Sequence, residues 1–345
     1  MALSANTRAT YRTGLAAFKS FCSMHNMGFQ GQPTTVPSEE ILCLFVCHCA
    51  DKLGLSYATI KSYLAGVKNA YIEWGLGDPL ITPLGQPMLE LALVLRGIKK
   101  SRQPNKRLRL PITVEILSNL CKRLDGSLHG SYTDALMKAA CTLAFFGFLR
   151  CGEFTTPTKT FHAEVGICLR DVAIFKDNNE FREVTLTLKQ SKTDPFREGC
   201  KISFAPIAGH VCPIESLMNY LAMRVPLKPT PHSPLFMCKD GSPLTRNLFL
   251  YLLDATCRRS QINPEGYSGH SFRIGAATTA AKCHVPEHII QVLGRWASTC
   301  YKTYIRTSKN TIHWAQQTMS QAGSHAWWHA HVASPICQFQ WYDGV

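Results

Sequence analysis

The sequence predicts a mostly helical α+β protein with a small antiparallel β-sheet, divided into two domains. Three observations support this prediction. The chain has 345 residues, a length that suits two domains better than one. Apolar residues recur at helical spacing through the first hundred residues. Strand-like segments joined by a polar turn then occupy the region between residues 167 and 206, and helical patterns return after it.

Four helices are expected in the first hundred residues, where they would form a compact bundle (residues 1–98). The first spans residues 7–27. The second opens at the cap signature Pro-Ser-Glu-Glu and covers 37–50, the third follows a serine cap and covers 56–74, and the fourth covers about 87–100. The third helix carries two basic residues, Lys61 and Lys68, beside its apolar stripe. These lysines are candidate DNA contacts.

A basic linker is expected at residues 99–111, where the composition changes abruptly and apolar periodicity stops. One interpretation is a solvated hinge or a nuclear-import signal. The other is a strap that lies along a phosphate backbone, and the two are compatible. The linker residues assigned to DNA binding are Lys99, Lys100, Arg102, Lys106 and Arg107.

The second domain is expected at residues 112–322. Its predicted helices cover 113–123, 131–149, 213–224, 245–259, 270–281 and 286–293, and its predicted strands cover 167–175, 183–188 and 201–206. The aromatic tail, 323–345, shows no clear period, and it fits either an interaction peptide or a disordered segment.

The charge of the chain favours a polyanionic partner. Lys and Arg number 37 against 23 Asp and Glu, a net charge of +14. An anionic membrane surface would also attract this charge. However, no stretch reaches the roughly 18 apolar residues that a membrane span needs, so we expect a soluble protein. The first ten residues are polar, and nothing in them directs the chain to an oxidising compartment.

The cysteines predict free thiols rather than disulfides or a metal site. There are 15, an odd number, scattered singly through apolar segments. The one cluster, Cys43, Cys47, His48 and Cys49, lacks a second pair of ligands elsewhere, and no Cys-x-x-Cys occurs. We therefore expect no metal and no cofactor. The phosphate-binding loop, the dinucleotide-binding glycine motif and the His-Glu-x-x-His motif are also absent from the sequence.

Arg150 is the first candidate for chemistry. It ends a long apolar run, where a guanidinium needs a partner, and Glu153 follows three residues later. This pair is either a structural ion pair or an arginine held rigid to bind phosphate oxygens. A second candidate pair, His270 and Arg273, would share one face of a helix. If His270 and Arg273 lie near Arg150, two arginines and a proton acceptor would surround one anion.

The segment Gly294-Arg295-Trp296 followed by Tyr304-Ile305-Arg306 completes an ordered set of motifs. With the Arg150 motif, Ser191-Lys192-Thr193-Asp194 and Gly269-His270-Ser271-Phe272-Arg273, the chain resembles the tyrosine recombinases, also called the phage-integrase family. The residues of these motifs are similar to those of the eukaryotic Crypton-type mobile-element branch of the family. The resemblance covers a helical core-binding domain and a catalytic domain.

The resemblance implies a role for each of these residues. Arg150 and Arg273 would be the catalytic arginines, with Glu153 supporting Arg150. Lys192 best matches the hairpin lysine, and Lys189 is its rival. His270 would be the base, and Tyr304 the nucleophile, with Tyr301 as its competitor one turn earlier on the same helix face. Arg295 occupies a position that is usually His or Trp in the family, so either Arg295 or Trp296 would contact a phosphate oxygen there.

The reaction that the resemblance implies is site-specific recombination without metal or ATP, through a 3′-phosphotyrosyl intermediate on double-stranded DNA. The family works as a tetramer, and Ile312, Ala315 and Met319 would form the partner contact. Two alternatives remain: a non-catalytic DNA-binding protein derived from a recombinase, and an enzyme of the type IB topoisomerase kind. The expected location is the nucleus if the source is eukaryotic and the cytoplasm otherwise.

Overall fold

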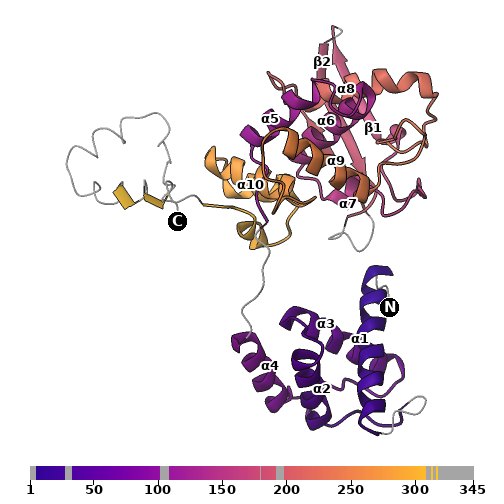
Figure 1. Ribbon diagram of the computed structural model, residues 1–345, viewed down its shortest axis with the longest axis vertical. Coiled ribbons are helices and arrows are strands. Elements are labelled where there is room, and N and C mark those ends of the chain that lie inside the picture. The colour runs from indigo at the N-terminus through magenta and orange to yellow at the C-terminus, as the bar shows by residue number, and fades with distance from the viewer. Residues whose placement is uncertain are drawn as a thin grey trace, which may run out of the picture. The chain divides into compact units, whose positions relative to one another are not determined.

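A computed structural model describes residues 5–27, 33–101, 109–178, 180–191, 198–307, 312–313 and 316–317. The chain forms two compact units, Met1–Arg107 and Leu108–Val345 (Figure 1). Within the described residues, no helix combines the length and the hydropathy needed to cross a bilayer. The architecture is mostly helical with one three-stranded antiparallel sheet, so the predicted fold class is confirmed.

The first unit contains four helices, as its apolar periodicity predicts. They are α1 (Ala5–Met24), α2 (Glu39–Asp51), α3 (Tyr57–Glu73) and α4 (Leu89–Ser101). Ser38 and Ser56 cap α2 and α3, each through a side-chain oxygen that accepts a backbone N–H three residues later. Phe18, Phe45 and Val67 form part of the shared core and are at most 1% exposed.

Two glycines allow α1 and α3 to pack with their backbones in contact. A Cβ atom on Gly66 would lie 2.5 Å from the carbonyl oxygen of Tyr11, and one on Gly14 would lie 2.5 Å from Cα of Tyr63. Since real Cβ atoms essentially never approach that closely, neither position accepts a larger residue without a shift of the helices.

The basic residues predicted to bind DNA lie in different settings. Helix α4 continues through Ser101, so Lys99 and Lys100 belong to its last turn rather than to a linker. Lys99 lies 5.7 Å from the centroid of the Tyr57 ring, and Lys68 pairs with Asp78 at 2.5 Å, whereas Lys61 is exposed. Arg102, Lys106 and Arg107 lie outside the described residues, as do residues 318–345, which include the aromatic tail.

The second unit surrounds a buried central helix, α6 (Ser131–Phe146) (Figure 1). The sheet has the order β1 (Val172–Asp177), β2 (Glu180–Leu188) and β3 (Cys200–Phe204). Val184 and Leu186 on β2 are completely buried in the same core as α6. The other helices are α5 (Val114–Leu124), α7 (Cys151–Phe154), α8 (Pro213–Arg224), α9 (Arg246–Arg259), α10 (Ser271–Lys282) and α11 (Glu287–Gly294), with 3₁₀ turns η1 (Leu169–Asp171), η2 (Val225–Leu227) and η3 (Thr299–Thr303).

Several predicted elements have different boundaries in the structure, and two of these differences have a clear physical cause. Helix α6 ends at Phe146 rather than at residue 149, because Gly147 caps it and Phe148 turns to a left-handed backbone conformation with φ 48°. Arg150 therefore does not end that helix; it is the N-cap of α7. The first strand begins at Val172 rather than at residue 167, because the Asp171 carboxylate accepts the backbone N–H of Cys168 at 2.7 Å and stabilises η1.

We expect Gly66→Ala to lower the free energy of unfolding by about 1–3 kcal/mol, since the added methyl group would collide with the backbone of α1. Gly97→Ala is the matched control. Gly97 lies inside α4, and a Cβ atom added to it would have no other atom within 4 Å, so alanine there should stabilise the helix by about 0.5–1 kcal/mol. Urea unfolding of both variants measures the difference. Equal stability of the two would contradict the close helix contact.

Candidate active site

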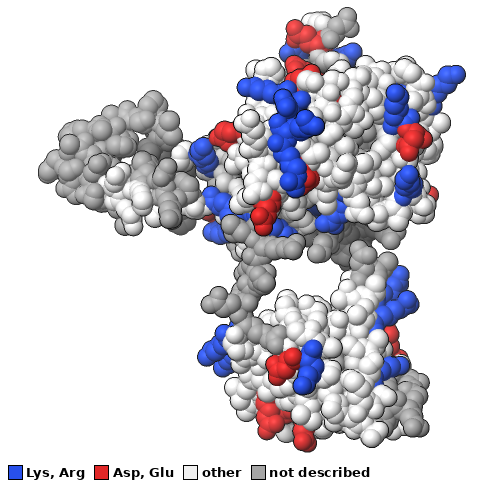
Figure 2. All heavy atoms as spheres, in the orientation of Figure 1, with Lys and Arg blue, Asp and Glu red and all other residues white. Residues whose placement is uncertain are grey.

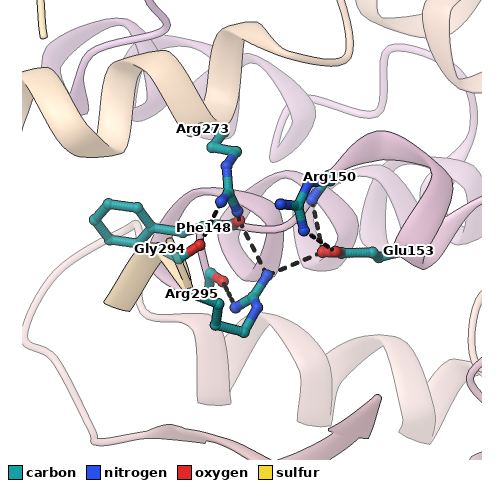
Figure 3. Close-up of polar contacts among 7 residues, drawn as sticks. Phe148, Arg150, Glu153, Arg273, Gly294 and Arg295 are labelled. Carbon is teal, nitrogen blue, oxygen red and sulfur yellow. Dashed lines mark hydrogen bonds and ion pairs between the residues drawn. The ribbon is translucent and has the colours of Figure 1, made fainter. Parts of the chain in front are cut away.

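Glu153 is the shared partner of two arginines (Figure 3). Its carboxylate accepts the backbone N–H and the guanidinium of Arg150, both at 2.8 Å, and the guanidinium of Arg295 at 2.9 Å. The Glu153 side chain is 6% exposed, and the side chains of Arg150 and Arg295 are each 15% exposed. The expected pairing of Glu153 with Arg150 is present, and the second partner, Arg295, comes from the far end of the unit's sequence.

The carbonyl oxygen of Phe148 is a second shared acceptor (Figure 3). It accepts hydrogen bonds from Arg273 and, at 3.2 Å, from Arg295. Arg295 also donates to the carbonyl oxygen of Gly147 at 2.9 Å, and Arg273 donates to that of Gly294. These contacts join the end of α6, the first turn of α10 and the end of α11 through main-chain oxygens and two guanidiniums.

Arg273 is completely buried, with a guanidinium carbon 4.2 Å from the centroid of the Trp296 ring and 5.8 Å from that of the Tyr304 ring. Burial, together with the charges of Arg150 and Arg295, lowers its pKa to about 10, so Arg273 stays charged at neutral pH. Its Nε atom has no hydrogen-bond partner among the described residues. Within this network three guanidiniums face one carboxylate, which leaves two positive charges without a counter-ion.

Trp296 and Arg295 both pack closely against neighbouring protein groups. The Trp296 ring is 6% exposed and packs on Gly294, where a Cβ atom would lie 1.7 Å from the ring. Its face covers the Arg273 guanidinium, a cation–π contact. Both Nη atoms of Arg295 are engaged by Glu153, Gly147 and Phe148. Both residues thus contact neighbouring protein groups. That one of them also contacts a phosphate oxygen stays a prediction from the sequence.

His270 lies at the N-cap of α10, beside the start of α7. Gly269 makes this possible, because a Cβ atom there would lie 2.4 Å from Cβ of Cys151. Burial lowers the pKa of His270 below its ordinary value of 6.5, and the charges of Arg109, Arg246, Arg273 and Arg150 lower it further. The imidazole is therefore neutral at physiological pH, the state that accepts a proton.

Tyr301 and Tyr304 lie in different environments. The sequence suggested one helix face for both, but the segment Thr299–Thr303 is a 3₁₀ turn and Tyr304 caps its end. The Tyr301 hydroxyl donates to the Glu287 carboxylate at 2.5 Å, and this hydrogen bond raises the pKa of Tyr301 and makes the phenol harder to deprotonate. The Tyr304 ring lies 5.1 Å from that of Trp296, on the arginine network.

The rival lysine, Lys189, is held by a different group of residues. Its ammonium pairs with Asp171 at 2.5 Å and donates to the carbonyl oxygens of Ala163 and Gly166 and to the sulfur of Cys168. These contacts anchor the end of β2 to the turn before β1, and they occupy all the donors of this ammonium. Lys192 lies outside the described residues.

Two further arginines near His270, Arg109 and Arg246, do not belong to the set of catalytic candidates that the motifs identify. Arg246 occupies the first turn of α9, where the helix dipole disfavours a cation, and this mismatch was a signal available in the sequence. No group of three or more His, Cys, Asp or Glu side chains in the described part of the chain is arranged to hold a metal ion. The cysteines of that part are free thiols.

No protein-family model matches the sequence, and no curated protein does. Solved structures do match. The XerH site-specific recombinase bound to palindromic difH substrate in a post-cleavage complex is 17% identical, with a TM-score of 0.64 over 90% of this chain and 79% of that chain. The Tn1549 transposon integrase in complex with transposon right end DNA is 13% identical, with a TM-score of 0.56 over 92% and 95%. A lambda integrase dimer bound to a COC′ core site is 16% identical, with a TM-score of 0.53 over 88% and 72%.

The fold of the chain is therefore that of the tyrosine recombinases. At these identities the similarity concerns the fold, and the chemistry must be argued from the residues of this chain.

We expect Glu153→Gln to lower the free energy of unfolding by about 3 kcal/mol, because it leaves the mostly buried guanidiniums of Arg150 and Arg295 without a carboxylate. Glu164→Gln removes an exposed carboxylate of the same unit and should leave stability unchanged. Urea unfolding of the full chain compares the two. Equal stability of both variants would show that Glu153 does not hold the arginines.

Proposed function

We propose that the protein is a DNA strand transferase of the site-specific recombinase type, which cleaves and rejoins DNA through a covalent bond to Tyr304. One observation carries this proposal: a tyrosine and a neutral histidine adjoin a layer of arginines whose positive charge exceeds its counter-charge. Such a site has the groups that phosphoryl transfer without metal requires, namely a nucleophile, a proton acceptor and fixed positive charge.

In the proposed reaction, the Tyr304 oxygen attacks the phosphorus of a DNA phosphodiester. Its proton passes to His270, and the bond from phosphorus to the 5′ oxygen breaks. Lys192 gives that oxygen its proton, so a 5′-hydroxyl and a 3′-phosphotyrosyl link result. Attack by a 5′-hydroxyl of another strand reverses the step without ATP. No metal or cofactor enters the scheme.

The three arginines have different parts in this scheme. Arg150, whose side chain is 15% exposed, binds the phosphate oxygens through its fork. Arg273 supplies charge from behind the Trp296 ring. Arg295 positions the other two, since it shares Glu153 with Arg150 and the Phe148 carbonyl with Arg273.

The proposed partner is double-stranded DNA, bound by a homotetramer because recombination needs two sites and four strand cleavages. The net charge of +14 supports a polyanion, and Figure 2 shows Lys and Arg side chains gathered in a continuous group on the visible face of the second unit. In the expected subunit contact, Ile312 is 46% exposed, while Ala315 and Met319 lie outside the described residues. We further propose a Crypton-type mobile-element origin, and action in the nucleus if the source is eukaryotic or in the cytoplasm otherwise.

A second candidate is a DNA-binding protein that does not cleave. The complete burial of Arg273, with both Nη atoms on main-chain carbonyls, favours it, because a catalytic arginine must act on the phosphate at least through its charge. A type IB topoisomerase activity is the enzymatic alternative, and relaxation of supercoiled plasmid without a recombined product would indicate it.

We expect the protein to become covalently attached to a nicked duplex from which the short 5′-hydroxyl fragment can diffuse away. Tyr304→Phe should abolish the adduct and leave binding nearly unchanged, because only the hydroxyl is lost. The matched control, Tyr301→Phe, should retain the adduct, since that hydroxyl is bonded to Glu287. Denaturing electrophoresis and peptide mapping measure the attachment.

The same assay in excess EDTA tests the metal-free scheme, and the adduct should still form.

Attachment of DNA at Tyr301 would show that the nucleophile is misassigned. If no adduct forms on several duplexes, including DNA from beside the gene, the non-catalytic candidate is the better one.

We expect the cleavage rate to be constant from about pH 8 down to 6.5 and to fall only at lower pH. Burial and the neighbouring arginines place the pKa of His270 below 6.5, so its neutral, proton-accepting form persists there. Single-turnover cleavage across this range measures the profile. His270→Gln should slow cleavage by about 10²–10⁴-fold and remove the acidic limb. A rate that falls with a midpoint above 6.5 would contradict the role of His270.

A further inference from the structure

Two exposed arginines, Arg109 and Arg246, lie close enough to His270 for their charges to lower its pKa. They come from segments far apart in the sequence, the approach to α5 and the first turn of α9. Neither side chain has an ion pair or a hydrogen bond to another described residue. Unpaired guanidiniums of this kind are available to a ligand from solvent.

Backbone hydrogen bonds hold Arg109 near His270. The N–H of Leu110 donates to the carbonyl oxygen of Gly266, and that of Ile112 donates to the carbonyl oxygen of Ser271, both at 3.0 Å. The chain that follows Arg109 therefore runs alongside the loop that carries His270. Gly275 strengthens this attachment, because its missing side chain lets α10 approach Ile112: a Cβ atom there would lie 1.7 Å from the Ile112 carbonyl oxygen.

Arg246 lies at the start of α9, which backbone hydrogen bonds join to the chain that leaves α7. The N–H of Arg246 donates to the carbonyl oxygen of Thr156 at 2.8 Å, and the N–H of Thr156 donates to that of Leu244 at 3.1 Å. This pairing ties the start of α9 to the chain that leaves α7, the helix whose N-cap is Arg150. Because Gly269 lies against Cys151 in α7, the loop that carries His270 meets this junction.

The electrostatics of His270 agree with this placement. Arg109 and Arg246 lower its pKa more than Arg273 and Arg150 do, and every described charge that shifts it is positive. Arg246 also stands at the positive end of the α9 dipole. Like charges gathered at a helix start, with no carboxylate among them, form a stable arrangement when an anion is bound.

We propose that Arg109 and Arg246 form a second phosphate site, which binds the DNA phosphate adjoining the one that Tyr304 attacks. This inference rests on the proposed function. Arg150 is mostly buried and Arg109 and Arg246 are exposed, so the two sites lie at different depths and suit successive phosphates of one strand. The planar fork of each arginine fits phosphate oxygens, and binding there positions the strand before cleavage.

The test measures DNA affinity of the full chain in a Tyr304→Phe background, so that no covalent product forms. The probe is a short duplex of arbitrary sequence, titrated at several salt concentrations. Arg109→Gln and Arg246→Gln should each weaken binding about threefold to tenfold and reduce the slope of log K against log salt by about one. Arg259→Gln is the matched control, since Arg259 is exposed at the far end of the same helix, about 20 Å away.

Salt slopes for Arg109→Gln and Arg246→Gln that stay equal to that of Arg259→Gln would overturn the proposal.

A second measurement tests the placement without DNA: the NMR titration of the His270 imidazole, assigned with His270→Gln. Arg246→Gln should raise the pKa of His270, and Arg259→Gln should not; an unchanged value for Arg246→Gln would also overturn it. If the slopes change but no adduct ever forms with the native Tyr304, the phosphate site stands and the proposed catalysis fails. If the adduct forms and the slopes do not change, the proposed catalysis stands and the phosphate site fails.

Discussion

The carbonyl oxygen of Phe148 and the carboxylate of Glu153 together hold three arginines that come from three separate segments of the chain. The rest of the second unit depends on this arrangement. Phe148 presents its carbonyl because α6 stops at Gly147 and Phe148 takes a left-handed conformation, and Arg295 takes the same conformation at the end of α11. Both conformations are strained for residues with a side chain, and the hydrogen bonds they permit offset that strain.

This arrangement also explains why the segment that carries Tyr304 lies on the arginines. Arg295 and Gly294 attach the end of α11 to α6 and α10, and Trp296 then covers Arg273 and leads to the 3₁₀ turn that ends at Tyr304. A charge buried as deeply as that of Arg273 is costly unless it is paired and hydrogen-bonded. The carbonyl oxygens of Phe148 and Gly294 and the face of the Trp296 ring offset most of the cost of burying this charge. An anion bound at the surface of the network would offset the rest.

Much of the fold could be predicted from the sequence because its signals are local. Ser38, Ser56 and Thr113 each cap the helix expected after them, and the apolar periods place the bundle helices within a few residues. Such local signals could not indicate contacts between residues far apart in the sequence. The attachment of Arg295 to Glu153 joins residues 142 positions apart, so no periodicity could indicate it. The pairing of Arg150 with Glu153 was predictable because the two are three residues apart and the apolar surroundings require a partner.

In the proposed function, Arg150, Arg273 and Arg295 hold a tetrahedral or pentacoordinate phosphoryl group beside Tyr304. The most direct measurement is a crystal structure of the full chain soaked with tungstate, an anion that resembles phosphate and is located by its anomalous scattering. We expect a tungstate ion within hydrogen-bond distance of Arg150 and His270, on the side of the arginine network where Tyr304 lies. Tungstate bound elsewhere on the basic surface, with this site empty at concentrations that fill the others, would contradict it.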